Sequence, residues 1–273
     1  MKYLVKIFMG LSLFVAGSAS AETAWYGGTF SANIVMHHPT KPEQQAKGKL
    51  YVGKHALRAE GTVGGETRVL LMDIKKQQIL SLNPSKKSYQ DGPGAAPMPP
   101  RPDLTVMPDN KAHPLCGNPK LGSCKKQGET TIGGVKAEEW LLTMPRGPQT
   151  WTMQVWVDPE RKIVLKHVTK QGPAMERKLL EITELNGRKT EKWQITQSYR
   201  GKSKSSLQWV DAKLRLPVKV ENNGKVSAEL TNLKEGPQPA KLFTLPKGYK
   251  KVTAKRSKPL GGHQQAPKGM QFH

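Results

Sequence analysis

From residue 134 to residue 233, apolar and polar residues alternate in a pattern that occurs twice. The matched positions keep one offset of 53 residues, and they include Gly134 with Gly187, Lys136 with Lys189, Glu138 with Glu191, Trp140 with Trp193, Trp156 with Trp209, and Asp158 with Asp211. Alternation at every second residue is the period of strands, because successive side chains of a strand point to opposite faces of the sheet. Two copies are too few for a solenoid. The pattern therefore predicts two β-meanders in one large curved antiparallel sheet, with few helices.

Each copy of the pattern predicts four strands. We expect them near residues 135–143, 150–158, 162–169 and 176–183 in the first copy, and near residues 189–197, 205–211, 215–221 and 226–233 in the second. Trp140 is in phase with Leu142, and Trp193 with Ile195, so each pair shares one face of its strand. We predict that these four side chains line an apolar cavity on the concave side of the sheet. The alternative is that the tryptophans only fill the core.

The segment before the repeat alternates in the same way and predicts a first meander, with strands near residues 30–36, 48–53, 56–60, 67–73 and 78–82. Residues 90–130 differ, because Pro97, Pro99, Pro100 and Pro102 follow one another closely. Proline removes the backbone donor that a sheet ladder needs. We therefore predict an insertion without regular structure here, serving either as a functional loop or as a simple tether to the repeats.

The two cysteines, Cys116 and Cys124, lie in this insertion and close a loop of nine residues. In an exported protein a disulfide is the natural state of such a pair, and it stabilises the fold by about 2.5 kcal/mol in the chain-entropy treatment. The spacing is not a CxxC motif, and no second cysteine pair completes a zinc site. We predict a structural disulfide, with no bound metal and no cofactor.

The N-terminus has the three parts of a secretory signal peptide. Lys2 and Lys6 precede the apolar residues 7–16, and small residues permit cleavage after Ala21. The apolar stretch is shorter than the about 20 residues that a membrane-spanning helix needs. We therefore expect an exported, periplasmic mature protein without a transmembrane segment.

The predicted organisation follows from these segments. It comprises a signal peptide at 1–21, one β domain at 22–254 and a basic, disordered tail at 255–273. The domain divides into the first meander at 22–89, the proline-rich insertion at 90–130, and the two repeats at 131–185 and 186–236.

The charge of the chain limits the partners it can have. Its 44 basic and 21 acidic residues give a net charge of +23, of which Lys2 and Lys6 leave with the signal peptide. Such a surface attracts anions, which outside the cytosol are membrane headgroups and acidic glycans; we expect no nucleic-acid partner. A basic cluster near the C-terminus is the candidate anionic contact, and it contains Lys250, Lys251, Lys255, Arg256 and Lys258. The alternative is a solvated tail.

Several short motifs extend over most of the mature chain. They include residues 30–36 (FSANIVM), 48–52 (GKLYV), 156–158 (WVD), 216–219 (LPVK) and 242–249 (LFTLPKGY). Together they resemble the exported LolA/LolB-like domains, and in particular the relatives classed as domains of unknown function. The resemblance implies a half-open antiparallel β-barrel whose concave side holds an acyl chain or another apolar ligand. It assigns no individual ligand-contacting residue.

The sequence contains no motif for catalysis. No serine has the glycine pattern of a nucleophile elbow, and no phosphate-binding glycine loop of the P-loop type occurs, so we predict that the protein is not an enzyme. Two hypotheses follow. The first is a periplasmic carrier that holds a lipid-like or acyl ligand in the half-barrel. The second is an envelope interaction protein that binds anionic polymers or membrane surfaces through its basic residues.

Overall fold

The computed structural model describes residues 26–37, 45–63, 65–73, 75–76, 78–92, 107–111, 113, 115–146, 149–170 and 172–253. The predicted signal peptide with its cleavage site at Ala21, and the tail at 255–273, lie outside the described residues. The first meander has six strands, which are β1 (Phe30–His37), β2 (Gln45–Val52), β3 (Ala56–Val63), β4 (Glu66–Asp73), β5 (Gln78–Asn83) and β6 (Ser88–Asp91).

The second half of the chain adds ten strands and one short 3-10 helix. They are β7 (Ser123–Ile132), β8 (Val135–Arg146), β9 (Gln149–Asp158), β10 (Ile163–Thr169), β11 (Ala174–Leu185), β12 (Arg188–Tyr199), β13 (Lys202–Asp211), β14 (Pro217–Asn222), β15 (Lys225–Glu235), η1 (Ala240–Phe243) and β16 (Lys250–Lys251). The described residues contain no helix long and apolar enough to cross a membrane.

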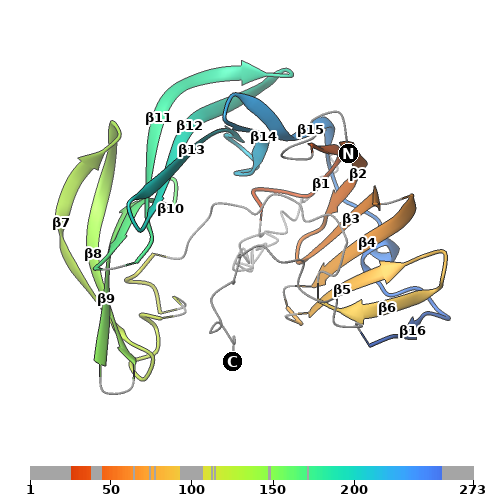
Figure 1. Ribbon diagram of the computed structural model, residues 1–273, viewed down its shortest axis with the longest axis horizontal. Coiled ribbons are helices and arrows are strands. Elements are labelled where there is room, and N and C mark those ends of the chain that lie inside the picture. The colour runs from red at the N-terminus through yellow and green to blue at the C-terminus, as the bar shows by residue number, and fades with distance from the viewer. Residues whose placement is uncertain are drawn as a thin grey trace, which may run out of the picture.

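All sixteen strands belong to one sheet, in the order β16-β6-β5-β4-β3-β2-β1-β15-β14-β13-β12-β11-β10-β9-β8-β7. The two meanders join where β1 pairs antiparallel with β15, and β16 pairs parallel with β6. Figure 1 shows the sheet bent into an open arc, with β7 to β13 on one side and β1 to β6 on the other. The predicted large curved antiparallel sheet is therefore confirmed, with a single parallel pair at one edge.

One prediction about the insertion was wrong. Residues 123–130 were expected to lack regular structure, but they form most of β7, the outermost strand next to β8. Its sequence, SCKKQGETTI, shows no apolar alternation because an edge strand packs few side chains into the core. Its charged residues also suit an edge, because charge discourages pairing with other chains.

The repeat also begins earlier than predicted. In the structure β8 to β11 correspond to β12 to β15, and β7 before them corresponds to β11 at the same offset. The turn Gly133-Gly134 matches Asn186-Gly187, and all four residues have positive φ, as a tight hairpin turn of type I′ requires. The bulges match as well, because the register shifts between Lys126 and Gly128 and again between Leu179 and Glu181.

Each repeat packs part of its surface onto the next unit of the sheet. One buried cluster combines Val135, Ala137, Ile163 and Leu165 of the first repeat with Trp193, Ile195 and Val210 of the second. A larger cluster combines Trp209, Leu214, Leu216 and Val218 of the second repeat with residues of the first meander, among them Phe30, Ile34 and Leu50. The first meander thus takes the place of a third repeat.

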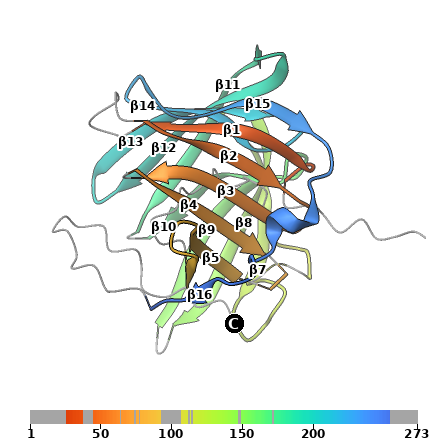
Figure 2. The ribbon, with the colours of Figure 1, turned by 90° about the vertical axis from the view of Figure 1, so that its right-hand side faces the viewer.

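The chain after β15 returns across the first meander. Arg58 Nη1 donates a hydrogen bond to the Leu242 carbonyl at 3.3 Å, and the Phe243 ring lies against Gly53, where an added Cβ would come within 2.9 Å of it. Figure 2 shows η1 beside the first meander, before the chain reaches β16. This return fixes β16 and its two lysines at the edge of the sheet.

Candidate functional site

The four predicted cavity residues lie on one face of the sheet. Strand register follows this face from one strand to the next: Trp140 pairs with Val155, Val155 with His167, His167 with Met175, and Met175 with Gln197. Gln197 lies on the face of β12 that also carries Trp193 and Ile195. We call this the apolar face. Trp140 and Leu142 belong to one buried cluster, with the cysteines and Met107 packed against it, and Trp193 and Ile195 belong to another. All four side chains are less than a tenth exposed. The role of these residues in lining a cavity stays a prediction.

Both tryptophans are held by a carboxylate two residues before them. Trp140 Nε1 donates to Glu138 Oε2 at 3.2 Å, and Trp193 Nε1 donates to Glu191 Oε2 at 3.1 Å. Glu191 also accepts a hydrogen bond from Arg161 Nε at 3.0 Å, and Arg161 in turn bonds Asp158. These partners satisfy the indole N–H groups and fix the orientation of the rings.

Methionines surround the buried clusters on the same face. Met36, Met72, Met144, Met153 and Met175 come from five different strands, and each is half-buried. Register places them all on the apolar face, since Met36 pairs with Ala228, Met72 with Leu57, Met144 with Trp151, Met153 with Leu142 and Met175 with Gln197. The sequence could have indicated this pattern for Met36, Met72, Met144 and Met153, because each of them is in phase with buried residues of its strand, whereas β11, which carries Met175, has no buried residue.

His167 and Arg177 also lie on the apolar face, and no pattern in the sequence predicted them there. His167 lies opposite Met175, and Arg177 lies opposite Ile195. Burial of the imidazole, and then the positive charge of Arg177, lower the pKa of His167 below its ordinary value. No local motif marks these residues, because their proximity depends on the pairing of β10 with β11.

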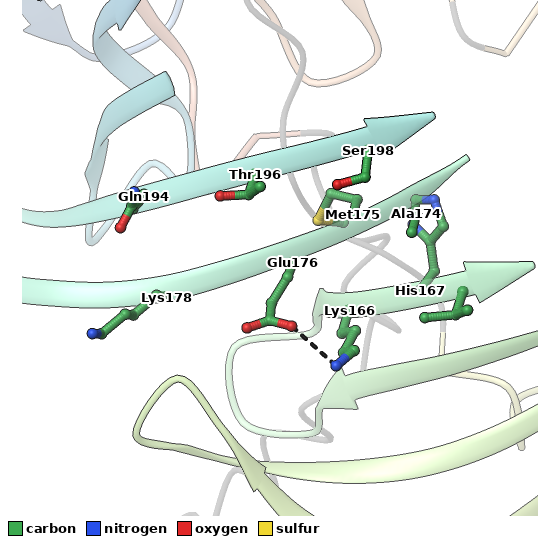
Figure 3. Close-up of a pocket in the computed structure, with 10 residues that line it drawn as sticks. Lys166, His167, Ala174, Met175, Glu176, Lys178, Gln194, Thr196 and Ser198 are labelled. Carbon is green, nitrogen blue, oxygen red and sulfur yellow. Dashed lines mark ion pairs between the residues drawn. The ribbon is translucent and has the colours of Figure 1, made fainter. Parts of the chain in front are cut away.

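A polar pocket of about 290 Å³ lies across β10, β11 and β12. Its polar lining consists of Lys166, His167, Glu176, Lys178, Gln194, Thr196 and Ser198, and Figure 3 shows these side chains on neighbouring strands; all but His167 lie on one face. On β12 these residues alternate with Trp193 and Ile195, so they lie on the opposite face of the sheet. In the sequence these β12 residues appear only as polar residues at every second position, a pattern that indicates a solvated face of a strand.

The predicted disulfide between Cys116 and Cys124 is confirmed, and their Cα atoms lie 5.4 Å apart. His113 lies beside the two sulfur atoms, with one ligand atom from each of the three residues within 4.8 Å of the others. His113 Nδ1 accepts hydrogen bonds from the backbone N–H groups of Leu115 at 3.2 Å and Cys116 at 3.0 Å. The sulfur atoms are bonded to each other and offer no thiolate, so the group acts as a structural loop.

The basic cluster is only partly within the described residues. Lys250 and Lys251 form β16, where both are exposed, and Lys251 Nζ lies 2.6 Å from Asp91 Oδ2. This hydrogen bond raises the pKa of Lys251. Lys255, Arg256 and Lys258 lie outside the described residues.

No protein-family model matches the chain, and no curated protein matches it. Among solved structures, a DUF1329 family protein from Desulfovibrio piger is 12% identical with a TM-score of 0.37, covering 82% of this chain and 91% of its own. A putative outer membrane lipoprotein-sorting protein domain from Vibrio parahaemolyticus is 9% identical with a TM-score of 0.35, covering 80% of this chain and 89% of its own. An uncharacterized conserved protein from Thermus thermophilus is 12% identical with a TM-score of 0.29, covering 83% of this chain and 90% of its own. At these identities and TM-scores the likenesses assign no family, ligand or activity to the chain.

Proposed function

We propose that the mature chain is an exported, non-enzymatic carrier that holds an acyl chain or similar lipid-like ligand against the apolar face, on the concave side of the sheet. The observation that supports this most is the set of five half-buried methionines around the buried clusters. Methionine is flexible and polarizable, and it is common on surfaces that accept apolar partners of varied shape.

The open sheet adds a second argument. β7 and β16 lie at opposite ends of the strand order and are not paired with each other. A sheet with unpaired edges can change its curvature without breaking its ladder, so a long ligand can enter between the edges. Trp193, which is 1% exposed, then serves as the floor beneath the methionines rather than as the first contact.

Native mass spectrometry of the mature protein, purified from its own periplasm and followed by organic extraction, tests this proposal. We expect a discrete added mass that extracts as an amphiphile. Met175→Gln should reduce its occupancy, because it places an amide against the acyl chain. Leu141→Gln is the matched control, since Leu141 is half-buried next to Trp140 but points to the opposite face. A clean ligand-free mass in repeated preparations, or equal loss in both variants, would contradict a carrier role.

The alternative is binding to anionic polymers or membrane surfaces through Lys250 and Lys251. Their exposed position on the edge strand β16 favours it. Such binding should weaken steeply as salt rises from about 50 to about 500 mM, because exposed charges are screened over about 8 Å at physiological ionic strength. Sedimentation with anionic vesicles at both salt concentrations measures this, and salt-independent binding would exclude it.

A further inference from the structure

Lys178 and Gln194 line the polar pocket, and their side chains have no hydrogen-bond or ion-pair partner among the described residues. Lys178 on β11 and Gln194 on β12 are directly opposite each other in the strand register. An ammonium group and an amide thus stand side by side and together offer several donors and one acceptor.

The groups around them are already paired and so are held in place. Lys166 Nζ lies 3.0 Å from Glu176 Oε2, as the dashed line in Figure 3 marks. The Thr196 hydroxyl bonds the Ser205 hydroxyl at 3.0 Å, and the Ser198 hydroxyl bonds the Ser203 hydroxyl at 2.7 Å. A hydroxyl and a carboxylate keep acceptor capacity after one such bond, so these groups can also contact a ligand.

A comparison of the two repeats shows which pocket residues belong to the packing that both repeats share, and which occur in one repeat alone. Strand register gives the row Trp156, Lys166, Glu176, and the second repeat gives the same row as Trp209, Lys219, Glu229. A row present in both repeats is explained by the packing they share. In the second repeat, however, the position of Lys178 is taken by Thr231, and the position opposite the glutamate, held by Thr196 in the first, is taken by Val35. Asn33 pairs with Thr231 and takes the position of Gln194, so the second repeat keeps an amide and a hydroxyl there but lacks the ammonium group of Lys178.

The polar groups of the pocket have the chemistry of a saccharide site. Hydroxyl, amide and carboxylate groups recognise sugar hydroxyls, and an ammonium without a counter-ion recognises an acid. Trp156 supplies an aromatic ring next to the pocket, with Lys166 Nζ 5.4 Å from the ring centroid. We propose that this pocket binds an acidic saccharide, with its carboxylate on Lys178 and its ring hydroxyls on Gln194, Glu176 and Thr196. The polar side chains that make these contacts lie on the opposite face from the carrier function, although His167 and Met175 of the apolar face also line the pocket.

The experiment is calorimetric titration of the mature protein with an oligomer of three galacturonic acid units, with maltotriose as the neutral analogue and inorganic sulfate as the plain anion. We expect binding of the acidic oligomer, at least about tenfold weaker binding of maltotriose, and little competition from sulfate. Lys178→Gln should weaken binding about tenfold, as expected for a charge-assisted hydrogen bond. Gln194→Leu should also weaken binding of the acidic oligomer, although this substitution does not change the charge of the protein.

Lys225→Gln is the matched control. Lys225 is an exposed lysine without a partner in the described residues, located at the turn between β14 and β15, and its substitution removes the same charge. Less than a twofold effect there, beside a tenfold effect of Lys178→Gln, supports the site. Equal effects of both substitutions, full competition by sulfate, or no binding of the acidic oligomer overturns it.

Discussion

Asp211 forms the turn between β13 and β14, and its removal tests the turn geometry that both repeats share. The residue is 1% exposed. Its Oδ1 accepts hydrogen bonds from the backbone N–H groups of Lys213 at 2.9 Å and Leu214 at 2.7 Å, and its Oδ2 accepts one from Arg188 Nε. A single carboxylate therefore holds the turn and joins it to the start of β12.

The expected loss can be built from these three bonds. Two bonds to neutral backbone donors contribute about 1 kcal/mol each, and one bond to a charged donor contributes about 1.5–3 kcal/mol. Asp211→Ala should therefore lower the free energy of unfolding by roughly 3.5–5 kcal/mol. That is a large part of the about 5–15 kcal/mol that stabilises a typical domain. Asp211→Asn keeps one oxygen for the backbone donors and loses the charge facing Arg188, so about half of this loss is expected.

Urea unfolding of the mature protein, followed by tryptophan fluorescence, measures both variants. Asp158→Ala in the first repeat is the internal comparison. Asp158 accepts the same two backbone bonds, from Glu160 at 2.8 Å and Arg161 at 2.9 Å. Its charged partner Arg161 also bonds Glu191, and Arg188 likewise bonds Glu235 at 2.9 Å, so each guanidinium keeps one carboxylate when its aspartate is removed. Asp158→Ala should therefore lower the free energy of unfolding about as much as Asp211→Ala. A loss below about 1 kcal/mol for Asp211→Ala would refute the reasoning.

Three further predictions rest on the same unfolding assay. Gly133→Ala should lower the free energy of unfolding clearly more than Gly134→Ala. Both glycines have positive φ, which costs an alanine about 1–2 kcal/mol, but only at Gly133 does an added Cβ come within 2.8 Å of another strand's backbone. Equal losses would argue against this close approach. Reducing the disulfide between Cys116 and Cys124 should lower the free energy of unfolding by about 2.5 kcal/mol. An unchanged urea midpoint would contradict this expectation. His167 has a lowered pKa, so the unfolded state takes up its proton first. The contribution of neutral His167 to the free energy of unfolding is complete above the unfolded-state pKa of 6.5, and it is lost as the pH falls below that value. His167→Gln should therefore flatten the loss of stability between about pH 7 and 5.5, and an unaltered pH profile would rule this out.

The sequence predicted most where local residues determine local geometry. The matched aspartates of the repeat are an example, because Asp158 and Asp211 both accept hydrogen bonds from the backbone N–H groups two and three residues later. Lys162 and Arg215 adopt positive φ at the matching positions, at 54° and 56°. This geometry repeats although the two residues differ, because the aspartate and not the residue at positive φ determines the turn.

The sequence predicted least about features that depend on which strands pair with each other in the sheet. β7 was missed because an edge strand buries little and keeps a polar sequence. The polar pocket was missed for a related reason. Lys178 and Gln194 are sixteen positions apart and look like ordinary solvated residues, and only the pairing of β11 with β12 places them opposite each other.

The pairing of β1 with β15 explains why the repeat does not stand alone. The first repeat packs Ile163 and Leu165 onto the second, and the corresponding residues of the second, Leu216 and Val218, pack onto the first meander. Without β1 and β2 those side chains would be exposed to water. β1 and β15 therefore have to meet although they are far apart in sequence, and the Thr29 hydroxyl donates a hydrogen bond to the Gly236 carbonyl across 207 residues. Such distant contacts form late because loop closure must precede them. The slow step of folding should therefore be the docking of the first meander onto the second repeat.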